Sequence, residues 1–513
     1  MERLKLFNYD AIKPRLYQEL IASTAIRRNT LVVLPTGLGK TVIAALVVAY
    51  RLQKYPSSKA LILAPTRPLC SQHQKTFQKL LRIDPEKVVL VTGKIKKEKR
   101  VDLYKKAKVV VSTPQCIKND LERGVLSLKD FSVVVFDEAH RCVKNYDYTH
   151  VAKAYTQQAL SPLILGLTAS PGGNPERIEE IKKHLKIEAV EIRSESDPDV
   201  APYVKKTKVE WVYVEFPEEF KKIKELLESV LEDRINFLKE RGLVDKDVKF
   251  SELIKLSEIL SESYYTTGER ISGIALSMVA EAIKIDHAIE LLETQGLTPL
   301  RIYFQNLKKQ KSRASRRVLN DPRVVDAILL TERLWKEGKR HPKMTKLIAI
   351  IKDILRANND GKIIVFANYR ATINEIIKTL EKNGIKCKKL VGQAKKDIDK
   401  GLKQKEQIRV LNEFKLGVFN VLVASSVGEE GLDIPEVSAV IFYEAIPSEL
   451  RRVQRRGRTG RTMPGRVIYL LTKGTRDEAY YWASFHRERK MKRVLYSLKR
   501  KSVKKSTIMD WLR

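Results

Sequence analysis

The sequence has few cysteines, few acidic residues relative to basic ones, and no long apolar run. Four cysteines are widely spaced without a CxxC pair, which argues against a disulfide framework or a zinc site: Cys70, Cys116, Cys142 and Cys387. No stretch of about 18 apolar residues could span a bilayer. The opening stretch, MERLKLFNYDAIKPRLYQ, has no apolar core of the signal-peptide type. We therefore expect a cytoplasmic, nucleoid-associated protein without a membrane partner.

The charge balance indicates a polyanionic partner. Lys and Arg number 98 against 62 Asp and Glu, a formal net charge of +36 in 513 residues. Such an excess concentrates nucleic acid near the protein. Many charged residues and few cysteines also suit a hyperthermophile's surface, so thermophily is a compatible second cause.

Short, continuously apolar runs predict buried parallel strands. They recur through the first 170 residues, at 31–34, 60–64, 88–92, 108–112, 132–136 and 163–167, and return at 362–366, 420–424, 439–445 and 466–472. Continuous apolar strands with amphipathic segments between them are typical of parallel sheets covered by helices on both faces. The predicted fold class is α/β, with two domains of similar build.

The middle of the chain predicts helices instead. Residues 216–242 begin near Pro217 and stop at Gly242, and residues 320–338 carry helix-start residues and end at a glycine. We expect an all-helical insert between two α/β domains. The predicted divisions are 1–214, 215–335, 336–485 and a basic C-terminal tail, 486–513.

A phosphate-binding loop is predicted after the first strand. Residues 31–41 read LVVLPTGLGKT, and a helical pattern follows. Backbone N–H groups of such a turn, with the helix N-terminus, bind phosphates. Lys40 would reach the β/γ-phosphates and Thr41 would hold Mg²⁺. Leu34 replaces the first glycine of the usual pattern, and the predicted nucleotide-binding residues are Pro35, Thr36, Gly37, Leu38, Gly39, Lys40 and Thr41.

A second apolar strand ends in two carboxylates, in SVVVFDEAH (132–140). Asp137 would hold a Mg²⁺-bound water at the strand's carboxyl end. Glu138 would orient and deprotonate the attacking water. A helix-capping role would account for one acid and not for both. ATP and Mg²⁺ are thus the expected cofactors.

These segments belong to an ordered series that resembles the superfamily 2 helicases. The series is GKT (39–41), APTRPL (64–69), TG (92–93), STPQ (112–115), DEAH (137–140), TAS (168–170), IIVFANYR (363–370), ASSVGEEGLDIP (424–435) and QRRGRTGR (454–461). The resemblance implies two RecA-like domains with ATP between them. It makes Arg458 and Arg461 arginine fingers, with Gln454 near the phosphate and water, while Arg455 and Arg456 better fit a nucleic-acid patch.

Further site residues follow from the same resemblance. RLYQ (15–18), with Arg15 and Gln18, corresponds to the adenine-reading motif, and Asp433 would meet the ribose with Gly431 nearby. The strand on which such a motor moves would be held mainly by its phosphates. The implied contacts are Thr66, Arg67, Thr92, Gly93, Thr113, Arg370 and Ser426.

A narrower resemblance is to the family of archaeal Hef and the FANCM translocase. It rests on APTRPLCSQH (64–73), the helical insert, HPKMTKL (341–347), LVGQA (390–394) and GLKQKEQ (401–407). It implies action on forked DNA, with the insert as a thumb-like domain. The basic segment 308–317 is the candidate contact, with a solvated charged face as the alternative; its cations are Lys308, Lys309, Lys311, Arg313, Arg316 and Arg317.

Two features near the C-terminus bear on partners. HRERKMKR (486–493) contains the ERK triplet of XPF-type nucleases without an upstream GD-type acidic motif, so we interpret it as a basic helix and predict no nuclease activity. A C-terminal nuclease half would then be a separate or missing part. KSTIMDWLR (505–513) loosely resembles a sliding-clamp peptide, although a disordered terminus is favoured.

The leading hypothesis is an ATP-dependent DNA helicase or translocase that unwinds forks or migrates junctions during replication-fork repair. The alternative enzyme is a double-stranded RNA-stimulated translocase of the Dicer or RIG-I-like type, since those motors share an insert at this place. A binding scaffold with an inactive ATPase is the third hypothesis, against which Lys40, Glu138 and Arg461 argue.

Overall fold

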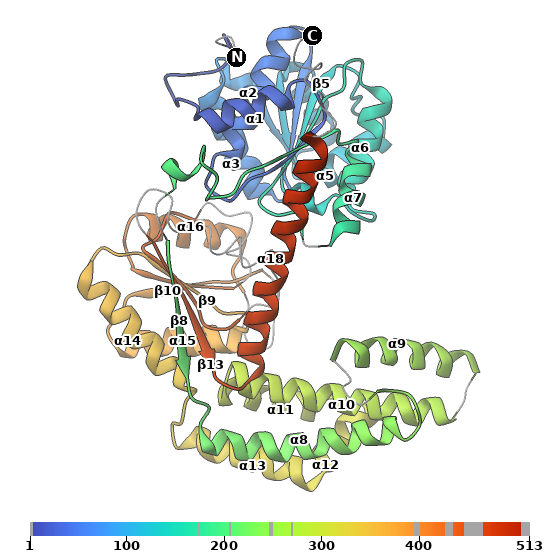
Figure 1. Cartoon of the computed structure of the whole chain (residues 1–513), viewed down its shortest axis with the longest axis vertical. Coiled ribbons are helices and arrows are strands. Elements are labelled where there is room, and N and C mark those ends of the chain that lie inside the picture. The colour runs from blue at the N-terminus through green and yellow to red at the C-terminus, as the bar shows by residue number, and fades with distance from the viewer. Residues whose placement is uncertain are drawn as a thin grey trace.

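A computed structural model describes most of the chain. It covers residues 4–172, 174–204, 207–245, 250–267, 270–393, 401–425, 434–445 and 465–503. Two α/β domains and a helical body are evident in it (Figure 1). No helix in these ranges is both long and apolar enough to cross a membrane.

The first domain, as described, is a seven-stranded parallel sheet in the order β3-β4-β2-β5-β6-β1-β7. Its strands are β1 (Thr30–Val33), β2 (Lys59–Leu63), β3 (Val88–Val91), β4 (Val109–Ser112), β5 (Phe131–Phe136), β6 (Ile164–Thr168) and β7 (Ala189–Ile192). Leu31 and Val33 belong to one core and Val32 to the other. Burial on both faces explains why these strands read as continuous apolar runs.

Helices cover both faces of this sheet. One face carries α1 (Leu16–Ala25), α2 (Lys40–Lys54) and α3 (Arg67–Leu80). The other carries α4 (Lys97–Lys106), α5 (Pro114–Glu122), α6 (Asp147–Gln158) and α7 (Pro175–His184).

The second domain is also a parallel sheet, in the order β10-β11-β9-β12-β13-β8. Its strands are β8 (Thr207–Val214), β9 (Ile363–Phe366), β10 (Cys387–Leu390), β11 (Val421–Ala424), β12 (Ala439–Phe442) and β13 (Gly465–Thr472). Its cores also include α14 (Pro342–Ala357), α15 (Arg370–Lys382) and α16 (Gln404–Lys415). The predicted fold class is thereby confirmed.

Strand β8 corrects one predicted boundary. The sequence predicts that residues up to 214 belong to the first domain, but β8 pairs with β13 along its whole length. Arg466 on β13 also makes a two-bonded ion pair with Glu210, at 2.8 and 2.9 Å. The chain therefore enters the second sheet before it forms the insert.

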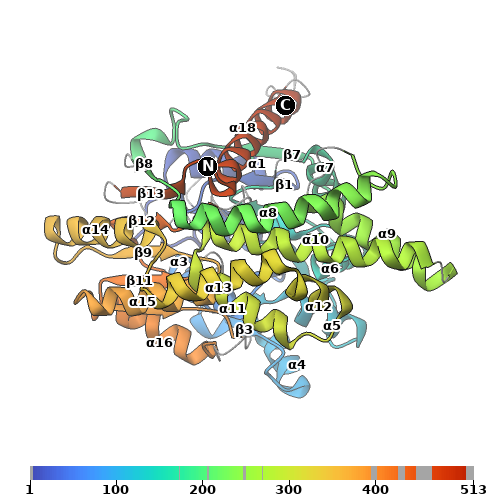
Figure 2. The ribbon, with the colours of Figure 1, turned by 90° about the horizontal axis from the view of Figure 1, so that it is seen from below.

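The insert is a bundle of six helices among the described residues. They are α8 (Glu218–Lys239), α9 (Phe250–Thr267), α10 (Arg270–Thr294), α11 (Leu297–Lys309), α12 (Arg313–Asn320) and α13 (Pro322–Lys336). Figure 2, which looks from below, shows α8, α10 and α13 running side by side across the near side of the molecule. The helices predicted at 216–242 and 320–338 correspond to α8 and α13.

Helix α18 (Arg476–Val503) corrects a second boundary. The tail predicted to start at 486 is instead the continuation of this helix. Tyr481 packs in a core of the second domain, while Met491 packs in a core of the first. The basic helix that we inferred at 486–493 is present, and it connects the two α/β domains (Figure 1).

Candidate functional site

The predicted phosphate loop lies between β1 and α2, as its sequence indicates. Gly37 and Gly39 have φ values of 89° and 80°, where side chains other than hydrogen are disfavoured. Helix α2 begins at Lys40, whose Nζ donates to the carbonyls of Leu34 (2.9 Å) and Pro35 (3.5 Å). The lysine thus bends back over the loop in which its predicted phosphate would bind.

The adenine-reading candidate Gln18 supports the same loop. Its Nε2 donates to the carbonyl of Leu38 at 3.0 Å, and its Oε1 accepts from the backbone N–H of Arg15 at 2.9 Å. The Arg15 guanidinium stacks over the ring of Tyr203 with 4.7 Å to the centroid. Both ends of the buried Gln18 amide are therefore engaged, and its contact with adenine stays a prediction.

Asp137 follows β5 and is 7% exposed. Its Oδ2 lies 2.7 Å from Nε2 of His73, and its backbone carbonyl accepts from the Tyr148 hydroxyl at 2.6 Å. Burial raises the pKa of Asp137, but the hydrogen bond from His73 and the charges of His73 and Lys40 outweigh it. The pKa lies below its ordinary value, so the carboxylate is ionised at neutral pH, as a magnesium ligand must be.

Glu138 has an unusual backbone, with φ of 50° and ψ of 48°. A left-handed residue other than glycine stores strain that is often found at functional sites. Its Oε2 lies 3.3 Å from Nδ1 of His140, yet this covered oxygen makes no hydrogen bond in the described structure. His140 Nδ1 lies 3.2 Å from the hydroxyl of Thr168, in the TAS motif.

The predicted nucleic-acid contacts of the first domain, called the track residues from here on, follow three neighbouring strands. Thr92 and Gly93 come after β3, Thr113 after β4, and Thr66 and Arg67 after β2. Since the strands are parallel and adjacent, these residues meet at one end of the sheet. A Cβ built on Gly93 would lie 3.9 Å from Nη2 of Arg67.

The helix starts at two of these places suit phosphate. Thr66 and Thr113 precede α3 and α5, and neither threonine side chain caps its own helix. First-turn N–H groups left uncapped in this way can be satisfied by an anion. The covered Thr66 hydroxyl also has no hydrogen-bond partner in the described structure.

Part of the predicted site cannot be located. Gln454, Arg458 and Arg461, the sugar-site residues Gly431 and Asp433, and the track residue Ser426 all lie outside the described residues, as do Arg455, Arg456 and the segment 505–513. Arg370 is described: it begins α15, and its Nη2 donates to the carbonyl of Gly392 at 2.9 Å.

One polar residue of this site escaped the sequence analysis. His73 ends the segment APTRPLCSQH, which carries part of the family resemblance and by itself assigns this histidine no role. Its partner Asp137 is 64 positions away, so only the fold brings the two side chains together. The available sequence signal for a role of His73 was its position on the same predicted helix as Arg67.

Comparison with known proteins defines the class. The DEAD/DEAH box helicase family matches residues 15–178, the helicase conserved C-terminal domain matches 343–463, and a helical bundle of ATP-dependent RNA helicases matches 219–337. Together with the two parallel sheets, these matches make the chain an ATP-dependent superfamily 2 helicase motor.

Individual relatives narrow the class to a family. The crystal structure of the Pyrococcus furiosus Hef helicase domain is 49% identical, with a TM-score of 0.73, over 93% of this chain and 100% of that one. A Methanocaldococcus jannaschii protein named as an ATP-dependent RNA helicase is 42% identical over 95% of this chain, and the ATP-dependent DNA helicase mph1 of Sclerotinia sclerotiorum is 31% identical over 91%. The chain belongs to the Hef/FANCM family of helicases. It spans 61% and 40% of the lengths of those two relatives.

Proposed function

We propose that this chain is an ATP-driven DNA motor that remodels forked or branched DNA. The observation that carries the proposal concerns the carboxyl-terminal ends of the strands in the first sheet. The predicted nucleic-acid contacts lie at one half of this edge, and the predicted nucleotide site lies at the other half. Strands β3, β4 and β2 present the track residues, while β5, β6 and β1 present Asp137, Thr168 and the phosphate loop. Ligands of open parallel sheets bind at this end of the strands.

The residues of the nucleotide half fit ATP with magnesium. The Lys40 ammonium would exchange its two backbone carbonyls for β/γ-phosphate oxygens. Thr41 and Asp137 supply the oxygen ligands that Mg²⁺ prefers, and the bound ion would neutralise developing phosphate charge. The covered Oε2 of Glu138 is an acceptor for an attacking water. Arg458, Arg461 and Gln454 would complete the site from the second domain.

The track half fits a nucleic-acid backbone. The starts of α3 and α5 offer uncapped amides, and Arg67 lies beside Gly93 to add a positive charge. Arg370 and Ser426 would extend this path over the second domain. Contacts of these types go to phosphates and carry no sequence information.

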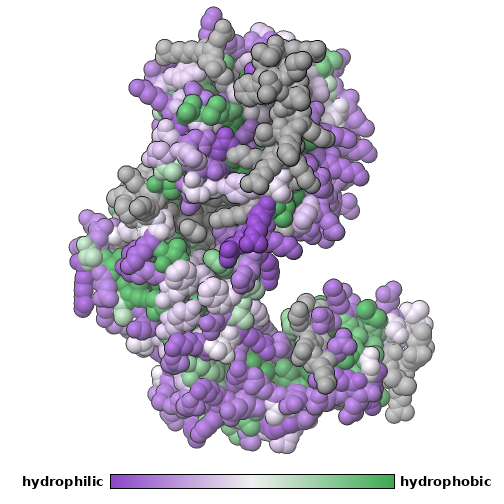
Figure 3. Space-filling model, in the orientation of Figure 1, coloured by the Kyte–Doolittle hydropathy of each residue, from purple (hydrophilic) through white to green (hydrophobic). Residues whose placement is uncertain are grey.

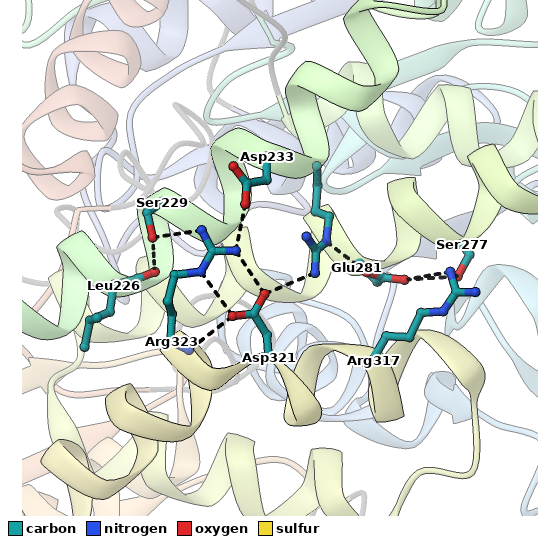
Figure 4. Close-up of polar contacts among 9 residues, drawn as sticks. Leu226, Ser229, Asp233, Ser277, Glu281, Arg317, Asp321 and Arg323 are labelled. Carbon is teal, nitrogen blue, oxygen red and sulfur yellow. Dashed lines mark hydrogen bonds and ion pairs between the residues drawn. The ribbon is translucent and has the colours of Figure 1, made fainter.

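The insert gives the proposed preference for branched DNA. Figure 3 shows an open hollow between the first domain and the free end of the insert, where we place a further nucleic-acid arm. All six cations of the segment 308–317 are exposed. Two of the six are partly engaged within the insert. Nη2 of Arg316 donates to the carbonyl of Lys311 at 3.0 Å. Nη1 of Arg317 lies 3.6 Å from Oε1 of Glu281 and 3.4 Å from the Ser277 hydroxyl (Figure 4).

DNA is favoured over RNA by the names of the similar proteins, although they are divided. Several relatives, mph1 among them, are named as DNA helicases, whereas two relatives and the helical-bundle family are named as RNA helicases. The double-stranded RNA-stimulated translocase is therefore the second candidate. A nuclease half and a sliding clamp bound through 505–513 stay predicted partners.

ATP hydrolysis with a panel of nucleic acids tests the proposal. The panel is single-stranded DNA, duplex, fork, four-way junction and duplex RNA. We expect the strongest stimulation by the fork or the junction. Glu138→Gln should lower kcat by about 10²–10⁴-fold while ATP still binds, because only the water-activating group is lost. Stimulation by RNA alone would replace the DNA proposal with the second candidate.

A further inference from the structure

Helix α3 connects the two halves of the sheet end. Its first residue, Arg67, is a track residue, and His73 lies nearly two turns further along the same helix. The helix follows β2, which borders β5, so it lies at the boundary between the track half and the nucleotide half. His73 reaches across this boundary to the carboxylate of Asp137.

The contact between the two side chains is short and buried. Nε2 of His73 and Oδ2 of Asp137 are 2.7 Å apart, and each residue is 7% exposed. The backbone of Asp137 is held separately: its N–H donates to Leu63 at 2.9 Å and its carbonyl accepts from Tyr148. His73 therefore orients the carboxylate of Asp137 and does not determine the position of its backbone.

Helix α3 packs against the domain beyond its first turn. The thiol of Cys70 donates to the carbonyl of Ala64 at 3.5 Å, and the ring of Phe77 is buried in the first core with its centroid 6.4 Å from that of His73. Close-packed interiors transmit strain, so a restraint on the first turn of this helix is passed along it to His73. A hydrogen bond of this length weakens steeply with misalignment.

We propose that His73 is a positioning residue that couples occupancy of the track at the start of α3 to the orientation of the Asp137 carboxylate, the proposed magnesium ligand. The inference rests on the proposed function and deepens it. When a backbone phosphate binds at Thr66 and Arg67, α3 is fixed, and His73 then fixes Asp137 for the metal. By linkage, magnesium with nucleotide strengthens DNA binding by the same factor.

Three variants of α3 separate coupling from simple stability. His73→Leu removes the hydrogen bond, and His73→Gln keeps an N–H donor on a side chain of similar reach. Gln74→Leu is the matched control, because Gln74 lies on the same helix and loses one hydrogen bond of its own, to the carbonyl of Val88 at 3.0 Å. All three are measured on the full chain.

The first readout is binding of a fluorescent ADP analogue titrated with Mg²⁺, with and without single-stranded DNA. In the wild type, DNA should lower the Mg²⁺ concentration at half-saturation. In His73→Leu we expect that concentration to rise about fivefold, or about 1 kcal/mol, and to lose its response to DNA. His73→Gln should restore most of the response, and Gln74→Leu should behave as the wild type.

The second readout is the ratio of DNA-stimulated to unstimulated ATP hydrolysis. His73→Leu should reduce this ratio at least about tenfold, with less effect on the unstimulated rate. If His73→Leu keeps the wild-type ratio and Mg²⁺ response and only melts earlier, as Gln74→Leu does, then His73 is a structural histidine and the inference is wrong. If the wild type itself is not stimulated by any nucleic acid, the proposed function fails instead.

Discussion

At the scale of single residues, His341 is a buried imidazole that must stay neutral. It caps α14: its Nδ1 accepts from the backbone N–H of Lys343 at 3.3 Å, so its Nε2–H donates to the carbonyl of Glu293 at 3.2 Å. Burial, together with the charge of Lys343, lowers its pKa to about 3. Lys343 is itself buried and forms an ion pair with Asp477.

This histidine predicts an acid-dependent loss of stability. The unfolded chain protonates it near pH 6.5 and the folded chain only near pH 3, so the folded state loses stability as pH falls between these values. Lowering the pH from 7.5 to 5 should reduce the free energy of unfolding in the wild type by about 2 kcal/mol more than in His341→Asn. The asparagine can still cap the helix. Urea unfolding of both proteins at the two pH values measures this difference. Equal losses would show that His341 does not titrate on unfolding.

Single residues could be predicted where their neighbours in sequence define them. Lys40 follows a glycine turn and Asp137 ends a buried strand, so local pattern placed both. The structure brings these two near each other, as expected, because β1 and β5 are separated only by β6. His73 and His341 could not be predicted, since their partners lie 64 and 48 positions away. Their roles depend on the tertiary fold.

At the scale of elements, the central strands could be predicted and most edge strands could not. Three strands that the sequence does not predict lie at sheet edges: β7, β8 and β10. Each carries charge: AVEI, TKVEWVYV and CKKL. An edge strand has one side free of neighbours and tolerates polar residues, so the continuous apolar signal is absent. Because the sequence does not predict β8, the predicted end of the first domain at residue 214 is also wrong.

The corner between α10 and α11 joins the insert to the second domain. Gln295 donates to Glu444, after β12, and accepts from the Thr372 hydroxyl of α15 at 2.7 Å. Gly296 has φ of 97°, and a Cβ added there would lie 2.9 Å from the Cβ of His341. The corner can therefore approach the second domain closely only because residue 296 is a glycine.

Gly296→Ala should loosen this joint. We expect a loss of about 2–3 kcal/mol in unfolding free energy, from the left-handed backbone and the collision with His341. Gly338→Ala is the matched control: its φ is 77°, but its added Cβ would meet open space. Gly338→Ala should lower the unfolding free energy by about 1 kcal/mol. Urea unfolding measures the loss of unfolding free energy in both variants, and limited proteolysis tests the joint between the insert and the second domain. Equal losses in the two variants would show that the collision with His341 contributes nothing.

At the scale of the whole molecule, α18 connects the two α/β domains. Its N-terminal part belongs to the second domain, where Asp477 accepts from the backbone N–H groups of Ala445 (3.0 Å) and Thr472 (3.1 Å). Its later part lies on the first domain, where the Tyr496 hydroxyl donates to Ser194 at 2.9 Å. A stiff helix fixed at both ends limits how far the domains can separate.

Met491 is the buried apolar residue by which this helix contacts the core of the first domain, and Val494 packs beside it. Met491 is 3% exposed, and its sulfur accepts from the hydroxyl of Ser170, in the TAS motif, at 2.7 Å. Met491→Ala should weaken the attachment of α18 to the first domain by about 2 kcal/mol or more, because a cavity replaces the side chain. We expect the radius of gyration from small-angle X-ray scattering to rise while helix content is unchanged. Arg493→Ala, an exposed position on the same helix, should leave it unaltered. If Met491→Ala also scatters as the wild type does, other contacts of α18 suffice to hold the two domains together, and the helix does not depend on its apolar anchor.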